Sequence, residues 1–252
     1  MPQFKSGLSF LHFGESVRCR YRYARTPAVD EFLAALIETS QARVRILPAG
    51  STYWRAQLGT DTAERKLEDP DQTIYYDEDV PLPANRMVPL PNAAHEGRVN
   101  PKGIPCLYLA TDKETAMSEV RPWLGAKISL ATFRTERDLR IVDCSVGHSA
   151  TFSPDVLFGN ASPEEITEAV WAQVDRAFSE PMNDDPATAG YVPTQVIAEA
   201  FRQRGLDGVV YQSRLGPGRN LALFALNCAK LVRRMLFKTT AIEFKFEEEP
   251  PT

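Results

Sequence analysis

Polar side chains that could do chemistry stand where predicted strands end or predicted helices begin. They are Tyr53 and Arg55 in the β-prone run 52–55, then Arg98, Tyr108, Glu119, Ser213 and Asn220. Each one alone has an ordinary structural interpretation. An arginine on a strand is usually solvated or ion-paired, a tyrosine in an aliphatic strand usually belongs to the core, and a serine at a strand end usually shapes a turn. Only their combination could indicate a site.

Several familiar catalytic sites are excluded because their motifs are missing. The sequence contains no G-x-x-x-x-G-K-[ST], no strand-linked G-x-G-x-x-G, no G-x-S-x-G and no H-E-x-x-H. A hydrolase of the Ser-His-acid type would need one of three histidines (His12, His95 and His148), and none has a recognisable context. The four cysteines are scattered without a C-x-x-C pair, so we expect no metal site. Lone thiols are typical of a reducing cytoplasm.

The charge balance argues against a surface built for nucleic acid. The chain has 29 basic and 33 acidic residues, a formal charge of −4, whereas proteins that hold phosphate backbones usually carry an excess of positive charge. No stretch approaches the ~20 apolar residues needed to cross a bilayer. The apolar run Leu8–Phe13 is interrupted by His12 and lacks the long apolar core of a signal peptide. We therefore expect a soluble cytoplasmic protein.

Helical patterns occur at residues 27–42, 162–178 and 194–204. The second begins with Ser162-Pro163-Glu164-Glu165, which predicts a capping box with proline at the first helical position. The third is expected to end at Gly205. A further helix is predicted to begin after Thr111, with Thr111 and Glu114 as a second capping box and Glu119 at the start of the third turn.

Strand patterns outnumber the helical ones and do not alternate regularly with them, which favours an α+β fold over a doubly wound sheet. The predicted strands are Ile104–Ala110, Ala126–Arg134, Leu139–Cys144, Gly208–Tyr211 and Leu221–Leu226. Near the C-terminus, Ile242, Phe244 and Phe246 alternate with charged residues, which predicts a half-exposed strand.

Residues 61–91 fit neither pattern. They contain eight acidic residues and five prolines, so we expect a long surface excursion. Long loops in compact domains are often lids or binding loops, but a plain solvated insertion accounts for this composition equally well.

The polar residues join into a pattern that resembles a known family. The stretch Gly97-Arg98-x-Asn100-Pro101-x-Gly103, followed by Tyr108-Leu109-Ala110, Thr115-Ala116 and Glu119, resembles the signature of RES-domain proteins, the toxins of bacterial RES–Xre toxin–antitoxin pairs. The family takes its name from an arginine, a glutamate and a serine, which Arg55, Glu119 and Ser213 fit. The stretches Asp207-Gly208-x-x-Tyr211-x-Ser213-Arg214 and Asn220-x-x-x-Phe224 also suit it.

The resemblance covers roughly residues 48–230 and implies a division of the chain. We predict an N-terminal extension with one helix at 1–47 and a RES-like catalytic domain at 48–235, with 61–91 inserted into it. A C-terminal strand and an acidic tail would occupy 236–252. The implied fold is like that of ADP-ribosyltransferases, with mixed or antiparallel sheets flanked by helices.

The resemblance also implies that NAD is consumed as a substrate and is not a recycled cofactor. Arg55 and Arg98 would bind its pyrophosphate, because a guanidinium matches phosphate oxygens bidentately. Tyr108 would flank the nicotinamide, and Glu119 would stabilise positive charge developing on the ribose. Ser213 would hydrogen-bond the ribose or the carboxylate. The remaining substrate-binding candidates are Tyr53 and Asn220.

The sequence leaves the acceptor of ADP-ribose open. Water or phosphate would make the protein an NAD glycohydrolase or phosphorylase, and a side chain of a target would make it a protein ADP-ribosyltransferase. A catalytically silent NAD-binding or interaction module is a further alternative. The resemblance implies an Xre-like antitoxin as partner, with nucleic acid contacted only through it, and a homodimer stays open.

Overall fold

The centre of the fold is one mixed β-sheet. The computed structural model describes residues 1–69, 72–91, 93–147, 155–156, 161–180, 189–243, 245–246 and 248. In this part of the chain eight strands lie in the order β1-β7-β8-β9-β5-β2-β6-β10. Their bounds are β1 Val44–Leu47, β2 Thr52–Leu58, β5 Leu107–Ala110, β6 Lys127–Thr135, β7 Leu139–Asp143, β8 Gly208–Gln212, β9 Arg219–Leu223 and β10 Ala229–Lys238. Strands β7 and β8 are parallel and the other neighbouring pairs are antiparallel.

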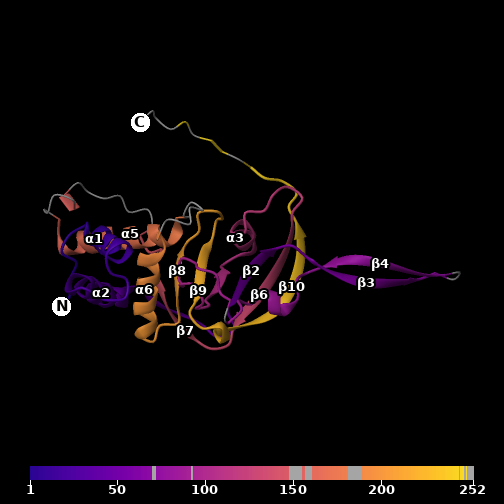
Figure 1. Cartoon of the computed structure of the whole chain (residues 1–252), viewed down its shortest axis with the longest axis horizontal. Helices are drawn as coiled ribbons and strands as arrows, with labels where there is room; N and C mark the ends of the chain where they lie inside the picture. The colour runs from indigo at the N-terminus through magenta and orange to yellow at the C-terminus, as the bar shows by residue number, and fades with distance from the viewer. Residues whose placement is uncertain are drawn as a thin grey trace.

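Helices cover one end of this sheet (Figure 1). They are α1 Ser9–Cys19, α2 Pro27–Ser40, α5 Pro163–Ser179 and α6 Val192–Gln203. The indole of Trp171 in α5 stacks on the ring of Phe201 in α6, with centroids 6.4 Å apart. Side chains of all four helices share one hydrophobic core with β7, β8 and β9. Helices on a mixed sheet confirm the α+β prediction.

The helix ends follow the predicted local chemistry. Ser162 accepts from the Glu165 amide while the Glu165 carboxylate accepts from the Ser162 amide, so the capping box before α5 is confirmed. Gly205 follows α6 with φ of 72°, a left-handed conformation that glycine adopts without steric cost. The N-terminal region differs from the prediction, because it contains two helices where one was expected.

Helix α1 was missed because its pattern is short. Phe10, Phe13 and Val17 are buried at helical spacing, while His12 and Glu15 face solvent. The apolar run at its start was weighed only as a signal-peptide core. Its three apolar side chains instead anchor residues 1–47 in the core that contains Trp171.

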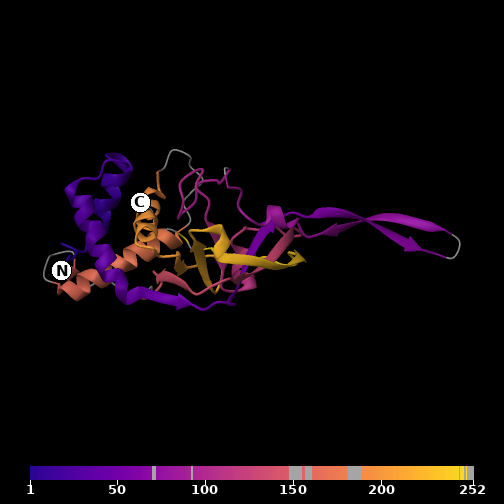
Figure 2. The same ribbon diagram turned by 90° about the horizontal axis from the view of Figure 1, so that it is seen from below.

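The acidic segment forms a β-hairpin. Strand β3 (Asp61–Glu68) pairs with β4 (Thr73–Val80) in a separate two-stranded sheet, and both views in Figures 1 and 2 show it projecting from the body. The expected surface excursion is therefore present, but it has regular secondary structure. Because nearly every side chain in it is exposed, its sequence lacks the apolar alternation by which half-buried strands are detected.

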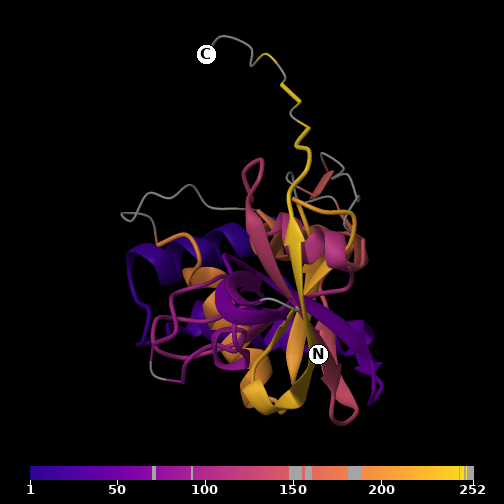
Figure 3. The same cartoon turned by 90° about the vertical axis from the view of Figure 1, so that its right-hand side faces the viewer.

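The C-terminal strand lies earlier than predicted. The described residues 239–243 and 245–246 contain no strand, and Phe244 lies outside the described residues. The last strand is β10, which pairs with β6. Figure 3 shows the described residues after β10 leading away from the sheet. Arg233 and Arg234 interrupt the apolar pattern of β10, which hid this strand in the sequence.

Candidate active site

A cavity of ≈ 650 Å³ lies between β2, β5, β9 and the loop 96–98. A short helix, α3 (Lys113–Ser118), closes one side of it. Five predicted site residues line the cavity: Arg55, Arg98, Tyr108, Glu119 and Asn220. Binding sites for small molecules commonly have volumes of about 300–1,000 Å³. The cavity is therefore large enough for a substrate of nucleotide size.

Glu119 is held by two hydrogen bonds to one of its oxygens. Its Oε1 accepts from Ser213 Oγ at 2.7 Å and from Asn220 Nδ2 at 2.6 Å. Its Oε2 lies 4.0 Å from an Nη atom of Arg98, and its side chain is 24% exposed. The two donors come from residues about a hundred positions along the chain. The fold thus fixes the carboxylate from one side and leaves its other oxygen beside a cation.

The turn between β8 and β9 packs against α3 and is hydrogen-bonded to it, and Glu119 lies at the end of this helix. Asp112 caps α3 by accepting from the Thr115 amide, and Thr115 Oγ1 accepts from the Gly218 amide at 2.8 Å. A Cβ at Gly218 would overlap the Asp112 carboxylate, and one at Gly216 would lie 2.6 Å from Thr115 Cα. These two glycines let the turn approach α3 closely, which brings the donors to the carboxylate.

The helix differs from its predicted form. Asp112 is the N-cap where Thr111 was expected, and Thr111 Oγ1 instead accepts from the Arg219 amide. Helix α3 ends at Ser118, so Glu119 is its C-cap and does not begin a third turn. Aspartate is at least as good an N-cap as threonine, so the capping signal was placed one residue too early.

Arg55 forms a cationic part of the cavity wall. It lies on β2 opposite Ala131, and one of its Nη atoms donates to the Tyr108 carbonyl at 3.0 Å. Its Nε is buried without a hydrogen-bond partner, and no carboxylate of the described residues pairs with it. Burial lowers the pKa of this guanidinium. A buried cation without a counter-charge is costly, so this position favours an anionic ligand.

Arg98 brings a second guanidinium to the same cavity. Its Cζ lies 5.9 Å from the centroid of the Tyr211 ring, and its side chain is 14% exposed. Burial raises the pKa of Tyr211 to about 12, so its hydroxyl is neutral near neutral pH. Arg98 is therefore held between an aromatic face and the Glu119 carboxylate.

Tyr108 anchors the loop that presents Arg98. Its hydroxyl donates to Asn100 Oδ1 at 2.7 Å and accepts from the Val99 amide at 3.0 Å. The Asn100 amide group donates to three backbone carbonyls of the same loop. A Cβ at Gly97 would lie 2.5 Å from the Tyr108 hydroxyl, so glycine is needed there. The Tyr108 ring lines the cavity, but its hydroxyl is already engaged.

Two predicted residues do not line the cavity. Ser213 is 5% exposed, and its Oγ accepts from the amides of Leu215 and Gly216 while donating to Glu119. Its hydroxyl is therefore fully engaged in positioning the carboxylate, one of the two roles expected for it. Tyr53 lies in the hydrophobic core with Met87 and Phe133, away from the position expected for a substrate-binding residue.

Several residues of the site could not be predicted from the sequence. Tyr191 and Gln57 line the cavity, but neither belongs to a recognised motif. Gln195 of α6 donates to Glu96 Oε1 and to the Gly97 carbonyl, both at 2.9 Å. This amide fixes the Arg98 loop to a helix about a hundred residues away, a relation that only the fold shows.

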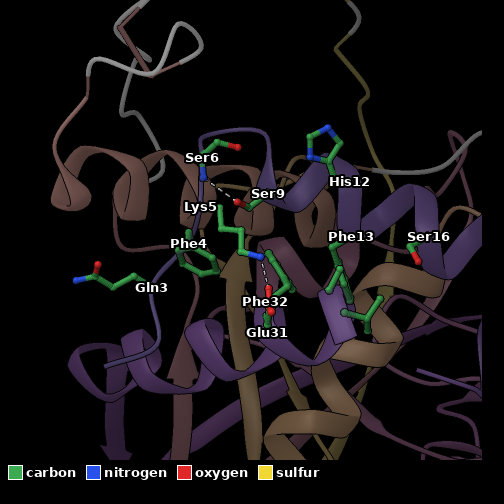
Figure 4. A pocket seen from close by; sticks show the side chains of 12 residues that line it. Gln3, Phe4, Lys5, Ser6, Ser9, His12, Phe13, Ser16, Glu31 and Phe32 are labelled. Atoms are coloured by element: carbon green, nitrogen blue, oxygen red, sulfur yellow. Dashed lines mark hydrogen bonds and ion pairs between the residues drawn. The ribbon is translucent and has the colours of Figure 1, made fainter. Parts of the chain in front are cut away.

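Another cavity, of ≈ 160 Å³, lies between α1 and α2 (Figure 4). Phe4, Phe13 and Phe32 form its apolar walls, and a Lys5–Glu31 ion pair stands at its rim. It contains none of the predicted site residues. The described residues contain no group of three or more potential metal ligands and no helix long and apolar enough to span a membrane.

Comparison with known proteins gives the family. The model of the RES domain matches residues 77–246, a range that contains Arg98, Tyr108, Glu119 and Ser213 but begins after Arg55. A solved structure described as the M. tuberculosis MbcT–MbcA toxin–antitoxin complex is similar over 81% of this chain and 92% of that chain, with 17% identity and a TM-score of 0.41. No curated protein matches. Because the family model covers more than half of the sequence, the chain belongs to the RES-domain family.

Proposed function

We propose that this protein is a toxin that cleaves the nicotinamide–ribose bond of NAD, with water or phosphate as the acceptor. The observation that supports it most is the Glu119 carboxylate, fixed by Ser213 and Asn220 on the wall of a cavity that also holds Arg55 and Arg98. NAD combines a pyrophosphate with a ribose that becomes cationic during cleavage. The cavity offers a complementary charge for each.

The guanidinium groups account for substrate binding. Arg55 is the stronger candidate for the pyrophosphate, because its buried Nε has no partner among the described residues. A phosphate oxygen there would satisfy the donor and neutralise the cation. Arg98 would contribute a second donor set from the loop 96–98, beside Glu119. The Tyr108 ring would flank the nicotinamide.

The carboxylate accounts for catalysis. When the bond between ribose C1′ and the nicotinamide nitrogen breaks, its electron pair goes to the pyridinium ring, so nicotinamide leaves neutral without a general acid. Positive charge develops on the ribose, as in glycoside cleavage. A fixed carboxylate stabilises that charge more than the ground state. Water or phosphate then bonds to C1′, and a proton lost from water passes to Glu119 or to solvent.

Nicotinamide release tests this proposal directly. Purified protein is incubated with NAD, with and without phosphate, and the products are separated by chromatography. We expect free nicotinamide in both cases, with ADP-ribose or its 1″-phosphate as the second product, and no effect of a metal chelator. NAD that stays intact after long incubation would contradict the proposal. ADP-ribose attached to protein in place of the free product would favour a protein ADP-ribosyltransferase.

The toxin role predicts an effect in cells. Expression of this chain alone in a bacterium should lower NAD and stop growth, whereas the Glu119→Gln variant should do neither. We propose further that an antitoxin of the Xre type restrains the protein by covering the cavity. Normal growth with undiminished NAD, despite soluble folded protein, would contradict the toxin role without deciding the reaction itself.

A further inference from the structure

The β3–β4 hairpin is a separate two-stranded sheet with little support from the rest of the fold. Each strand has eight residues, about 25 Å at the rise of an extended chain, and both views show it outside the body (Figures 1 and 2). A two-stranded hairpin is marginally stable in water on its own. Its exposed surface is therefore a candidate for binding a second molecule.

The two faces of the hairpin differ in chemistry. Residues directly opposite in the register share a face, which places Leu67, Ile74 and Tyr76 on one side, with 54%, 40% and 49% exposure. On the other side Glu64 stands directly opposite Asp77, a like-charge pair that destabilises the ribbon. Residues 61–80 carry eight acidic and two basic side chains. The acidic face also exposes Tyr75 by 62%, so a partner with basic charge beside exposed apolar groups would suit this one face.

The chain itself carries such a surface at the last strand of the sheet. Strand β10 has four basic and no acidic residues, and no ion pair joins them to a carboxylate of the described residues. The turn before β6 exposes Trp123 and Leu124 by 64% and 66%, and its Gly125 amide donates to the carbonyl of Thr239, just after β10. We call this surface, with Lys230, Arg233, Val232, Trp123 and Leu124, the β10 patch.

The hairpin of the same chain cannot cover this patch. Asp79 at the base of the hairpin pairs with Lys127 of β6, which fixes the root beside the sheet, while the two strands run outward from there (Figure 1). Glu64 and Asp77 are exposed and stand opposite each other midway along the two strands. Lys66, the basic residue on the same face, pairs with Glu68, so further basic groups would have to come from a second molecule.

We propose that the hairpin of each copy packs against the β10 patch of a second copy, in a two-fold symmetric dimer with exchanged arms. In such an interface both contacts are identical, and each is acidic and apolar on one side and basic and apolar on the other. This proposal is independent of the reaction proposed above.

Charge reversal on each side gives the sharpest test. Sedimentation equilibrium should show wild-type protein at twice the 28.1 kDa chain mass. Glu64→Lys with Asp77→Lys makes the hairpin basic, and Lys230→Glu with Arg233→Glu makes the patch acidic. Each double variant alone places like charges together, so its dimer dissociation constant should rise about 100-fold or more. Mixed in equal amounts, the two variants should form a one-to-one heterodimer.

Controls separate this outcome from general charge effects. The exposed substitutions Glu199→Lys and Arg22→Glu lie on other surfaces and should leave the dimer intact, and circular dichroism checks folding. If a double variant aggregates, a chain with residues 62–79 replaced by two glycines should be a folded monomer. Monomeric wild-type protein, or a dimer that survives both reversals, would overturn the proposal. So would a hairpin that binds only a different, basic protein.

Discussion

The two charged walls of the cavity are built in opposite ways. Glu119 has two hydrogen-bond donors on one oxygen, a neighbouring guanidinium, and a glycine turn that packs on its helix. Arg55 has one backbone carbonyl and a buried Nε without a partner. The Glu119 carboxylate has its hydrogen-bond donors in the empty cavity, whereas the buried Nε of Arg55 would gain a partner only from an anionic ligand.

This difference distinguishes Glu119, a carboxylate oriented for catalysis, from Arg55, a cation that binds the substrate. A carboxylate that must stabilise a transition state has to be oriented before the substrate arrives, because reorganisation during the reaction would cost rate. A cation that binds phosphate gains by staying unpaired, since an internal carboxylate would compete with the ligand. Substitutions on the Glu119 wall should therefore change kcat, and substitutions of Arg55 should change KM and the stability of the empty protein.

Glu119→Gln is expected to give the largest effect. The change is isosteric, and the amide oxygen can still accept from Ser213 and Asn220, so only the charge is lost. Loss of one preorganised electrostatic stabiliser costs ~10²–10³-fold in kcat, while KM for NAD should change little. Steady-state nicotinamide release measures both. The matched control is Glu114→Gln, an exposed residue of the same helix, which should keep full activity. Near-normal kcat in Glu119→Gln would contradict the catalytic role.

Arg55→Met should weaken the binding of NAD without lowering the stability of the empty protein. Loss of a charged hydrogen-bonding group costs about 1.5–3 kcal/mol, so KM should rise by about 10- to 100-fold. Without NAD the same variant should unfold at an equal or higher temperature, because replacing a buried unpaired charge by an apolar side chain removes a desolvation cost. Thermal unfolding with and without NAD measures both effects. A large loss of stability in the empty protein would show that Arg55 has a structural role instead.

Ser213→Ala should have a smaller effect, confined to kcat. The variant keeps the Asn220 donor to Glu119 but loses the second donor and leaves two turn amides without their acceptor. A hydrogen bond to a charged group contributes about 1.5–3 kcal/mol. Because Asn220 still holds the carboxylate, we expect a loss at the lower end of that range, about tenfold in kcat, with little change in KM. Complete loss of activity, or a covalent intermediate on Ser213, would contradict the positioning role and indicate a nucleophile.

Sequence reasoning predicted the parts of this fold that depend on local chemistry. The capping box at Ser162 and the aliphatic strand Leu139–Asp143 were found because each signal lies within a few residues. The hairpin was missed because an exposed ribbon needs no apolar alternation. Strand β10 was missed because basic residues occupy its solvent-facing positions.

The site also contains contacts that are local in the sequence, which could be predicted, and contacts between distant residues, which could not. The motif around Arg98 and Tyr108 could be recognised because its contacts span about ten residues. The hydrogen bonds from Ser213 and Asn220 to Glu119 span 94 and 101 residues, so no spacing rule could show them. Tyr53 was included because it neighbours Arg55, but its place in the core is set by packing across the sheet.

The smallest expected effect is that of alkaline pH on the rate. Burial raises the pKa of Tyr211 to about 12 and that of Tyr108 well above 10, so both hydroxyls stay neutral where an exposed tyrosine would begin to ionise. Neither hydroxyl should therefore gain charge between pH 7 and 10. In a Tyr191→Phe variant, which removes the other tyrosine that lines the cavity, kcat/KM for nicotinamide release, corrected for uncatalysed breakdown of NAD, should be flat there. Because the folded state holds these protons more tightly than the unfolded state, stability should fall as the pH rises above about 10. A decline in kcat/KM centred below pH 9.5, in protein that stays folded, would show that one of these tyrosines ionises more easily than its burial predicts.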